Sequence, residues 1–328
     1  MKLTNLKSTL AWLVTATAAV PAIGHAQADA YPSKPITFIV PFPAGNVTDV
    51  LARTIAQGLS AKLGQSVIVE NRPGAAGIIG TQQVANAKPD GYTMMYGSSG
   101  PIASHVSIYK KLPYDPLQSF APVNGLSSNP LILVVNASTP YKTIEEFVEY
   151  MKKNPGKVSF GSPGVGTGAH LVGEQFQVKT DTRMTHVPYK DSSTLYSDLL
   201  SGRIDAVFDF VPVMRQNLAA GKVRVLAITR DTRAASLPAV PTLKERGYDM
   251  SFNTWSALLM PAGTSNEIVQ KMSGAVRETM KSPEVVKFLE ENESTSRATL
   301  GPNDLKAFIT GEIAMYRDLV KKAGVTAE

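Results

Sequence analysis

Short apolar runs alternate with amphipathic stretches along most of the chain, and the first such pair illustrates the pattern. Ile36–Val40 is apolar or β-branched throughout, as in a strand that is buried on both faces. Pro41 and Pro43 follow, and because proline cannot donate to a sheet ladder we expect the strand to end there. Residues 50–63 then carry apolar side chains at helical spacing. The pattern predicts a strand, a tight loop and a helix.

The loop between this strand and helix is the first candidate for a binding site. Gly45 and Asn46 tolerate positive φ, and Thr48 or Asp49 can cap the helix. A strand, tight loop and helix in this order point free backbone N–H groups at an anion. Arg53 follows Asp49 by four residues, which favours an ion pair on the helix over direct ligand contact. We therefore expect the backbone of the loop, rather than catalytic side chains, to do the binding.

The same alternation continues in two series. The first series adds strands at 66–71 and 92–96 and a helix at 78–87. The second has strands at 157–160, 184–188, 205–208 and 223–228, and helices at 143–153, 169–178, 194–200 and 211–219. Strands that alternate with helices predict an α/β fold with parallel strands. Such sheets bind ligands beyond the carboxyl ends of their strands, where the loops starting at Pro41, Asn71 and Gly97 are expected.

Two extended apolar segments, at 120–136 and 251–260, separate these series, and the tail from 265 to about 322 has a helical pattern throughout. We therefore predict a two-lobed protein with a double hinge, in which the tail returns to the first lobe. The first lobe comprises residues 29–128 and 254–328, and the second, inserted lobe comprises residues 129–253.

The N-terminus has the features of a secretory signal peptide. A basic start precedes the apolar stretch Leu10–Ile23, and an A-x-A cleavage motif ends at Ala28. An uncleaved membrane anchor is the alternative, but the apolar stretch is short and Pro21 interrupts it. We expect residues 1–28 to be removed, with cleavage after Ala28 or two residues earlier, and the protein to be exported to a bacterial periplasm.

Composition narrows the possible functions. The chain has 33 Lys and Arg and 27 Asp and Glu, and loss of the two lysines of the signal peptide leaves 31 − 27 = +4. This mild charge, without a basic run that includes aromatic residues, argues against a nucleic-acid partner. The absence of cysteine excludes disulfides, thiolate catalysis and Cys-ligated metals. No later apolar stretch is long enough to span a membrane. We expect no cofactor.

The glycine-rich segment 161–170, GSPGVGTGAH, follows a predicted strand and opens a helix. No Lys follows as in a P-loop, and the glycines do not match G-x-G-x-x-G, which argues against nucleotide binding. The Ser162 and Thr167 hydroxyls and the neighbouring N–H groups can hold an anion at the N-terminus of the helix. The alternative is a plain glycine-rich turn in which Thr167 caps the helix.

Ser98 and Ser99 lie in a predicted loop, GSSGP, and are either hydroxyl donors to a ligand or ordinary turn residues. A serine hydrolase needs a base beside its nucleophile, and the chain has no G-x-S-x-G motif. The histidines of the mature chain are also too few and too scattered for a zinc site: His105, His170 and His186.

Two other residues have competing interpretations. Asp209 is expected at the carboxyl end of a strand, where it either orients a ligand or serves as a capping residue. Trp255 either lines a cleft or packs at the hinge. Among the candidate loops only one contains an arginine, Arg72. A carboxylate ligand would therefore be held by backbone amides, hydroxyls and water rather than by a guanidinium group.

The mature chain carries, in this order, the motifs VPFPAGNVTD, NRPGAAGIIG, KPDGYTMM, HVPYKDS, SGRIDAVFD, GKVRVLAITRDTRAASLPAVPTLKERG and MPAGT. Together they resemble the Bug family, the extracytoplasmic solute receptors of tripartite tricarboxylate transporters. The resemblance runs from about Tyr31 to the C-terminus, so it covers essentially the whole mature chain.

The resemblance implies an α/β fold of the periplasmic-binding-protein type II class, with two α/β lobes joined by two crossing hinge strands. It also implies binding of small carboxylates through main chain and water, without catalysis. We expect a monomer that closes over a small organic acid and transiently contacts integral-membrane transporter subunits. The ligand contacts implied for this chain are Phe42, Pro43, Ala44, Gly45, Asn46, Val47, Ser98, Ser99, Ser162, Gly164, Thr167, His170, Tyr189, Asp191, Ser192 and Asp209.

Three positions depart from the family pattern, because Asn46, Ala76 and Asp191 stand where its members usually have glycine. The Asn46 amide adds a donor and an acceptor to the predicted pocket. Asp191 adds a negative charge close to where an anion would bind, which is unfavourable without compensation. These departures favour a monocarboxylate, an aromatic acid or a ligand with a polar neutral end over a dicarboxylate.

The resulting hypothesis is a periplasmic receptor that delivers a small organic acid to a membrane transporter. Presentation of the liganded surface to a sensor kinase is one alternative. An exported serine hydrolase that uses Ser98 or Ser162 is another, and the missing base argues against it.

Overall fold

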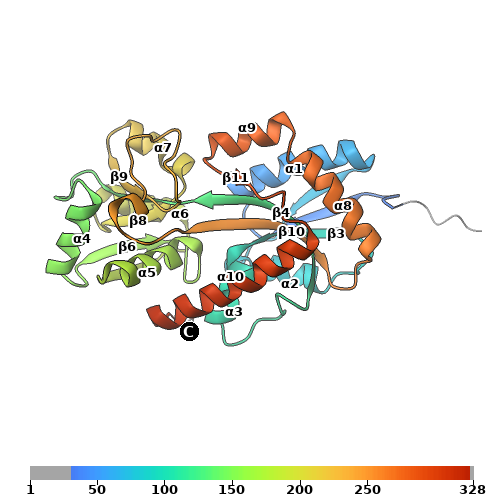
Figure 1. Cartoon of the computed structure of the whole chain (residues 1–328), viewed down its shortest axis with the longest axis horizontal. Helices are drawn as coiled ribbons and strands as arrows, with labels where there is room; N and C mark the ends of the chain where they lie inside the picture. The colour runs from blue at the N-terminus through green and yellow to red at the C-terminus, as the bar shows by residue number, and fades with distance from the viewer. Residues whose placement is uncertain (1–30, 326–328) are drawn as a thin grey trace, which may run out of the picture. The chain divides into compact units, whose positions relative to one another are not determined.

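The computed structural model describes residues 31–325, so the predicted signal peptide, residues 1–28, lies outside the described residues. The described strands form two sheets, each covered by helices (Figure 1). No helix in this part of the chain combines the length and apolarity needed to cross a membrane.

The first sheet has the strand order β11-β4-β10-β3-β1-β2. β1 pairs in parallel with both β2 and β3, so the carboxyl ends of these three strands meet at one edge, as the sequence predicted. β10 pairs antiparallel with β3 and β4, which makes the sheet mixed rather than parallel throughout. The strands are β1 Ile36–Val40, β2 Val67–Asn71, β3 Thr93–Ser98, β4 Phe120–Pro130, β10 Asn253–Pro261 and β11 Thr295–Ser296.

Helices cover both faces of the first sheet. One face packs against α1, α8 and α9, and the other against α2, η2, α3 and α10. The helical segments are α1 Val47–Leu63, η1 Ala75–Gly77, α2 Ile78–Ala85, η2 Gly100–Ser104, α3 His105–Ile108, α8 Asn266–Thr279, α9 Pro283–Glu291 and α10 Pro302–Ala323. We call this sheet and its helices the first lobe.

The second sheet has the order β7-β6-β8-β5-β9. β6 pairs in parallel with β7 and β8, and β5 runs antiparallel to β8 and β9. Its strands are β5 Ile132–Asn136, β6 Val158–Ser162, β7 Met184–Pro188, β8 Ala206–Asp209 and β9 Val223–Ile228. The accompanying helices are α4 Ile144–Lys153, α5 Gly168–Thr180, α6 Ser192–Ser201, α7 Val211–Ala219 and η3 Lys244–Arg246. These elements form the second lobe.

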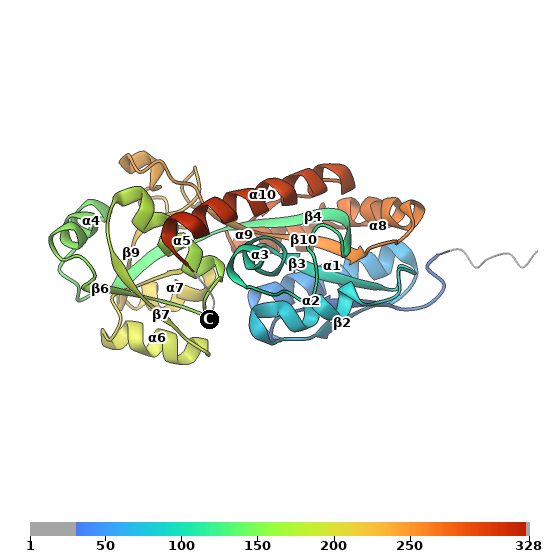
Figure 2. The same ribbon diagram turned by 90° about the horizontal axis from the view of Figure 1, so that it is seen from below.

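Two crossing segments join the lobes, as predicted (Figures 1 and 2). β4 continues into β5 through Leu131, and the chain returns through Phe252 into β10. In addition to the pairing of β4 with β10, the Thr229 hydroxyl bonds to both segments: the Leu131 N–H donates to Thr229 Oγ1 (2.9 Å), and Thr229 Oγ1 donates to the Phe252 carbonyl (2.6 Å).

The tail differs from the prediction in two respects. It is not helical throughout, because α9 ends at Glu291 and a stretch that includes β11 pairs with β4 before Pro302 opens α10. It also does not pack on the first lobe alone, since α10 packs against α3 and β4 and also against α5 of the second lobe. The short β11 sequence, Thr295–Ser296, has no helical apolar spacing, and its partner strand lies far away in the sequence.

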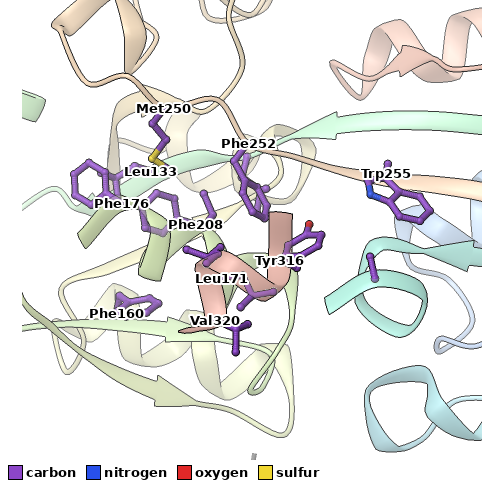
Figure 3. Close-up of a cluster of buried hydrophobic side chains, with 14 of the residues drawn as sticks. Leu133, Phe160, Leu171, Phe176, Phe208, Met250, Phe252, Trp255, Tyr316 and Val320 are labelled. Atoms are coloured by element: carbon purple, nitrogen blue, oxygen red, sulfur yellow. The ribbon is translucent and has the colours of Figure 1, made fainter. Parts of the chain in front are cut away.

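The largest apolar core runs through both lobes. Phe160, Phe176 and Phe208 fill the second lobe, and the cluster continues through Phe252 and Tyr316 toward Trp255 in the first (Figure 3). Trp255, on β10, therefore packs against α10. Of the two interpretations of this residue, packing at the hinge is the one observed, rather than lining of a cleft.

Candidate ligand-binding site

The loop after β1 is organised by the two polar residues at the start of α1. Asn46, and not Thr48 or Asp49, is the N-cap: its Oδ1 accepts from the Asp49 N–H at 2.8 Å. Its φ is −79°, so only Gly45, at +82°, uses the positive φ expected at both positions. The prediction was wrong because the helix begins earlier, at Val47, and an N-cap residue has extended backbone.

Because Asn46 is a cap, its replacement has graded consequences. Asn46→Ala is expected to lower the free energy of unfolding by about 1 kcal/mol, whereas Asn46→Gly should cost only a few tenths, since glycine is tolerated at an N-cap. Urea denaturation of both variants checks this. Equal losses in the two variants would contradict the capping role.

The Asp49 carboxylate is the internal anion of this loop. One oxygen accepts from the Gly45 N–H (2.8 Å) and from Arg53 Nε (3.0 Å), and the other accepts from Asn71 Nδ2 (2.8 Å). The expected Asp49–Arg53 pair is confirmed. Asp49 is 2% exposed. Burial alone would raise the pKa of Asp49, but the bonds from Arg53, Gly45 and Asn71 outweigh it and hold the pKa below the ordinary 3.8.

These bonds change which backbone groups are available to a ligand. The Gly45 N–H is occupied by Asp49, and the Asp49 N–H by Asn46. The N–H groups of Val47 and Thr48 lie in the first turn of α1, where no intrahelical acceptor exists. In this loop the N–H groups open to an anion are therefore those of Val47 and Thr48 rather than that of Gly45, and anion binding by the loop stays a prediction.

Val47 and Thr48 line a small cavity of about 30 Å³ to which both lobes contribute. The other lining residues come from α1, β3 and β4, from the start of α7, and from the stretch after α9: Leu51, Tyr96, Asn129, Phe210, Pro212, Asn292 and Ser294. Ser294 Oγ donates to Asn129 Oδ1 at 2.7 Å. No Lys, Arg, His, Asp or Glu is among these lining residues.

Of the predicted contacts, Val47 lines the cavity and Asp209 precedes the lining residue Phe210. Sequence reasoning missed Asn129, Asn292 and Ser294, which sit in extended segments far apart in the chain and carry no local motif. Thr48 was considered only as a cap. Phe42 is partly buried, and Pro43, Ala44, Gly45 and Asn46 are exposed.

Asp209 is buried at the carboxyl end of β8, as predicted. Its Oδ1 accepts from the Phe210 N–H at 2.7 Å. Burial raises the pKa of Asp209 to about 6, although hydrogen bonds from Tyr196 and from the Phe210 backbone oppose this shift. The carboxyl group thus bonds to the residue that precedes α7, and its contact with a ligand stays a prediction.

The loop after β6 brings together residues that the sequence suggested were scattered. Ser162 Oγ lies 2.7 Å from His186 Nε2, and the rings of His170 and His186 stack with centroids 3.9 Å apart. The expectation that no base stands near a candidate serine was therefore wrong, because β6 and β7 pair side by side. Ser162 nevertheless has no exposed surface, so its hydroxyl is not accessible to a substrate. Burial, and then His170, lowers the pKa of His186 to about 3.

The same loop is closed by its own hydrogen bonds. Thr167 caps α5, accepting from the His170 N–H (3.4 Å) and donating to the Gly164 carbonyl (2.8 Å). The Gly166 N–H donates to His170 Nδ1 (3.1 Å), and Ser104 Oγ of the first lobe donates to the Gly166 carbonyl (3.1 Å). The capping interpretation of Thr167 is confirmed, and ligand contact by this loop stays a prediction.

The remaining predicted contacts have structural partners of their own. The GSSGP loop does not exist, because Ser98 still pairs with β10 and η2 begins directly after Ser99, which is buried. Tyr189 donates to Asp198 Oδ2 at 2.8 Å. Asp191 caps α6, accepting from the Thr194 N–H (2.8 Å) and hydroxyl (3.0 Å), while Ser192 is exposed at the first position of that helix.

The Asp191 carboxylate is thus engaged by α6. Hydrogen bonds from Thr194 hold the pKa of Asp191 below its ordinary value.

Residues 31–325 contain no group of three or more His, Asp or Glu side chains placed to hold a metal ion.

Two α/β lobes, two crossing segments and a cavity between the lobes define a solute-binding protein with the periplasmic-binding-protein fold. The family model described as "Tripartite tricarboxylate transporter family receptor" matches residues 51–325. The chain belongs to this family of receptors, which confirms the resemblance noted from its motifs and the expectation that it is not an enzyme.

Three similar proteins illustrate the relationship. Protein BugT of Bordetella pertussis is 35% identical over 328 residues, with 99% of each chain covered. The structure of R. palustris Rpa4515 with adipate has a TM-score of 0.82 and 33% identity, covering 90% of this chain and 99% of that one. MatC of Rhodopseudomonas palustris with bound malate has a TM-score of 0.79 and 29% identity, covering 88% and 100%.

Proposed function

We propose that this protein is an exported receptor that binds a small organic carboxylate between its lobes and delivers it to the membrane subunits of a tripartite tricarboxylate transporter. The observation that carries the proposal is the cavity between the lobes, into which the first turn of α1 faces. Adipate and malate, the ligands named for two similar structures, belong to the same chemical class.

The cavity holds an anion by hydrogen bonding rather than by net charge. The Val47 and Thr48 N–H groups stand at the positive end of the α1 dipole, and the Thr48 hydroxyl is a further donor. The Asn129 and Asn292 amides each donate one hydrogen to another residue and have a second one to offer, whereas the Ser294 hydroxyl is used by Asn129. A neutral polar lining of this kind discriminates by geometry and by bridging water.

The size of the cavity implies motion. About 30 Å³ is room for ordered water and not for an organic acid. Ligand entry therefore requires the lobes to separate about the two crossing segments, and ligand shifts the equilibrium toward the closed state in proportion to its preference for that state. We take the lobes as residues 29–128 with 254–328 and residues 129–253. We take residues 1–28 as a signal peptide that directs export and is then cleaved.

The proposal predicts that a carboxylic acid stabilises the protein. The test is a thermal-shift screen of mono- and dicarboxylic acids that includes adipate and malate. An acid that binds should raise the Tm, because at 100 times its Kd it adds about 2.7 kcal/mol to the free energy of unfolding. The amides of the same acids serve as uncharged controls. A sugar or a cationic compound that raises the Tm while every acid fails would overturn the ligand class.

A matched pair of variants locates the site. Thr48→Ala removes a cavity hydroxyl and should weaken binding of the identified acid about tenfold or more, the effect of one hydrogen bond to a charged group. Thr54→Ala removes a hydroxyl of the same helix that donates to the Val50 carbonyl and should leave affinity unchanged. Equal effects in the two variants would move the site elsewhere.

A further inference from the structure

The three residues 292–294 face both lobes at once. Asn292 and Ser294 line the cavity between the lobes. Glu293, between them, is 6% exposed and has a φ of +54°, a left-handed conformation that is unfavourable for a side chain larger than glycine. Such a conformation persists only where the contacts of the residue hold it in place.

All the partners of the Glu293 carboxylate lie in the loop that follows β9, in the second lobe. Arg230 Nη2 and the Ala235 N–H donate to Oε2, both at 3.1 Å, and the Ser236 N–H donates to Oε1 at 2.7 Å. Arg230 also donates through Nη1 to the Glu293 carbonyl at 2.9 Å. We call Arg230, Glu293 and the 235–236 amides the clamp.

The clamp adds a link between the lobes beside the crossing segments, since Arg230 directly follows Thr229, which bonds to both of them. Glu293 lies between α9 and β11, and β11 pairs with β4 of the first sheet, whereas Arg230 and the 235–236 amides belong to the second lobe. A neighbouring contact has the same direction: Arg215 of α7 donates to the Glu291 carbonyl at 2.7 Å. The 292–294 stretch is therefore held from both sides of the cavity.

The clamp is ionic and largely shielded from water. The Arg230 and Glu293 side chains are 16% and 6% exposed. Burial alone would raise the pKa of Glu293, but hydrogen bonds from Ser236 and Ala235 and the charge of Arg230 outweigh it, so the carboxylate is ionised at neutral pH. A buried, fully bonded carboxylate of this kind has strict geometric requirements, and separation of the lobes would break every bond at once.

We propose that Glu293 is a positioning residue of the ligand site: bound by the second lobe, it holds Asn292 and Ser294 over the cavity and links ligand binding to closure. The inference rests on the proposed function for the identity of the ligand, and on the described contacts for the clamp itself. The clamp and a bound ligand favour the same arrangement of the lobes. Loss of the clamp therefore lowers the affinity for the ligand without removing a residue that contacts it.

The test compares Glu293→Gln, Arg230→Gln and the double variant with Glu245→Gln. Glu245 is the matched control, since it accepts from Arg233 and from the Thr242 N–H inside the second lobe only. Calorimetry with adipate should show binding about tenfold weaker in both clamp variants, with the loss in the double variant no larger than in either single one. Glu245→Gln should bind as the wild type does.

A second measurement needs no ligand. The chain has no cysteine, so spin labels attach only to cysteines that are introduced. Suitable positions are Gln83→Cys on α2 and Ser197→Cys on α6, which are exposed and lie in different lobes (Figure 2). Pulsed distance measurements on the ligand-free protein should give longer and broader distances in the clamp variants than in the wild type or in Glu245→Gln. Circular dichroism establishes that each variant is folded.

The outcomes separate this inference from the proposed function. Unchanged distances in the clamp variants overturn the clamp whatever the ligand is. Unchanged adipate affinity in variants whose distances have lengthened overturns the link between clamp and ligand. If no acid binds the wild type, the proposed function fails, while the distances still decide whether the clamp holds the lobes together.

Discussion

Asp49→Ala is expected to abolish binding of the acid ligand and to lower the free energy of unfolding by about 2–4 kcal/mol. The buried carboxylate accepts bonds from Gly45, Arg53 and Asn71. Hydrogen bonds to charged groups contribute about 1.5–3 kcal/mol each, and part of the loss is recovered by water and by the exposed Arg53. Without Asp49 the Gly45 N–H loses its acceptor, and the turn that presents Val47 and Thr48 to the cavity is no longer fixed.

The Asp49 effect has a defined pH dependence. Because the pKa of Asp49 is lower in the folded protein than in the unfolded chain, its stabilisation is fully present above the unfolded value, near 3.8, and is lost as the pH falls through the lower folded value. In urea denaturation, the free energies of unfolding of the wild type and Asp49→Ala should differ strongly at pH 7 and less at pH 3.

Asp304 provides the control for this experiment. It is an exposed acid in the first turn of α10, so Asp304→Ala tests the general effect of removing a carboxylate near a helix N-terminus. That effect is expected to stay below about 1 kcal/mol, with no change in ligand affinity. An Asp49→Ala protein that resembles Asp304→Ala in both measurements would remove Asp49 from the organisation of the site.

Trp255→Ala is expected to lower the free energy of unfolding by about 3–5 kcal/mol, the range for truncating a large buried aromatic side chain. Trp255 is 2% exposed and packs edge-on against Phe308, with ring centroids 5.2 Å apart. Its Nε1 donates to Glu312 Oε2 at 2.7 Å, so the side chain attaches β10 to α10. Its loss leaves a cavity in the first lobe beside a crossing segment and an incompletely bonded carboxylate on α10.

The Trp255 variants separate packing from hydrogen bonding. Burial raises the pKa of Glu312, while the bonds from Trp255 and the charge of Arg297 oppose this shift. Trp255→Phe retains most of the apolar contact but not the donor, and should cost about 1–3 kcal/mol. Unfolding in urea is followed by circular dichroism rather than by tryptophan fluorescence, because Trp255 is the only tryptophan within residues 31–325 and both variants lack it. A cost below about 1 kcal/mol for Trp255→Ala would contradict the hinge-packing role.

Much of the secondary structure could be predicted from the local sequence. The predicted elements 184–188, 211–219 and 223–228 coincide with β7, α7 and β9, because each has a continuous or periodic apolar pattern with a turn on either side. The tail was the main error. Its apolar spacing favoured helix, but the 292–301 stretch has distant partners: β11 bonds to β4, and Glu293 bonds to the loop after β9.

The candidate site shows the same division. The loop after β1 was found from strand, proline and glycine signals alone, yet which of its N–H groups remain free depends on Asp49, whose carboxylate bonds to Asn71 of the adjacent strand. The Ser162–His186 contact was missed because β6 and β7 are joined by a helix and meet only through sheet pairing.

The sequence by itself determined the family, the two α/β series and the two crossing segments, because these depend on apolar periodicity, turn residues and motifs read along the chain. Only the tertiary structure decided which side chains share a cavity. Thr48, Asn129 and Ser294 are far apart in the sequence, and their proximity is set by how the two sheets pack about the crossing segments. Periodicity specifies the face on which a residue lies, whereas packing between elements specifies what that face meets.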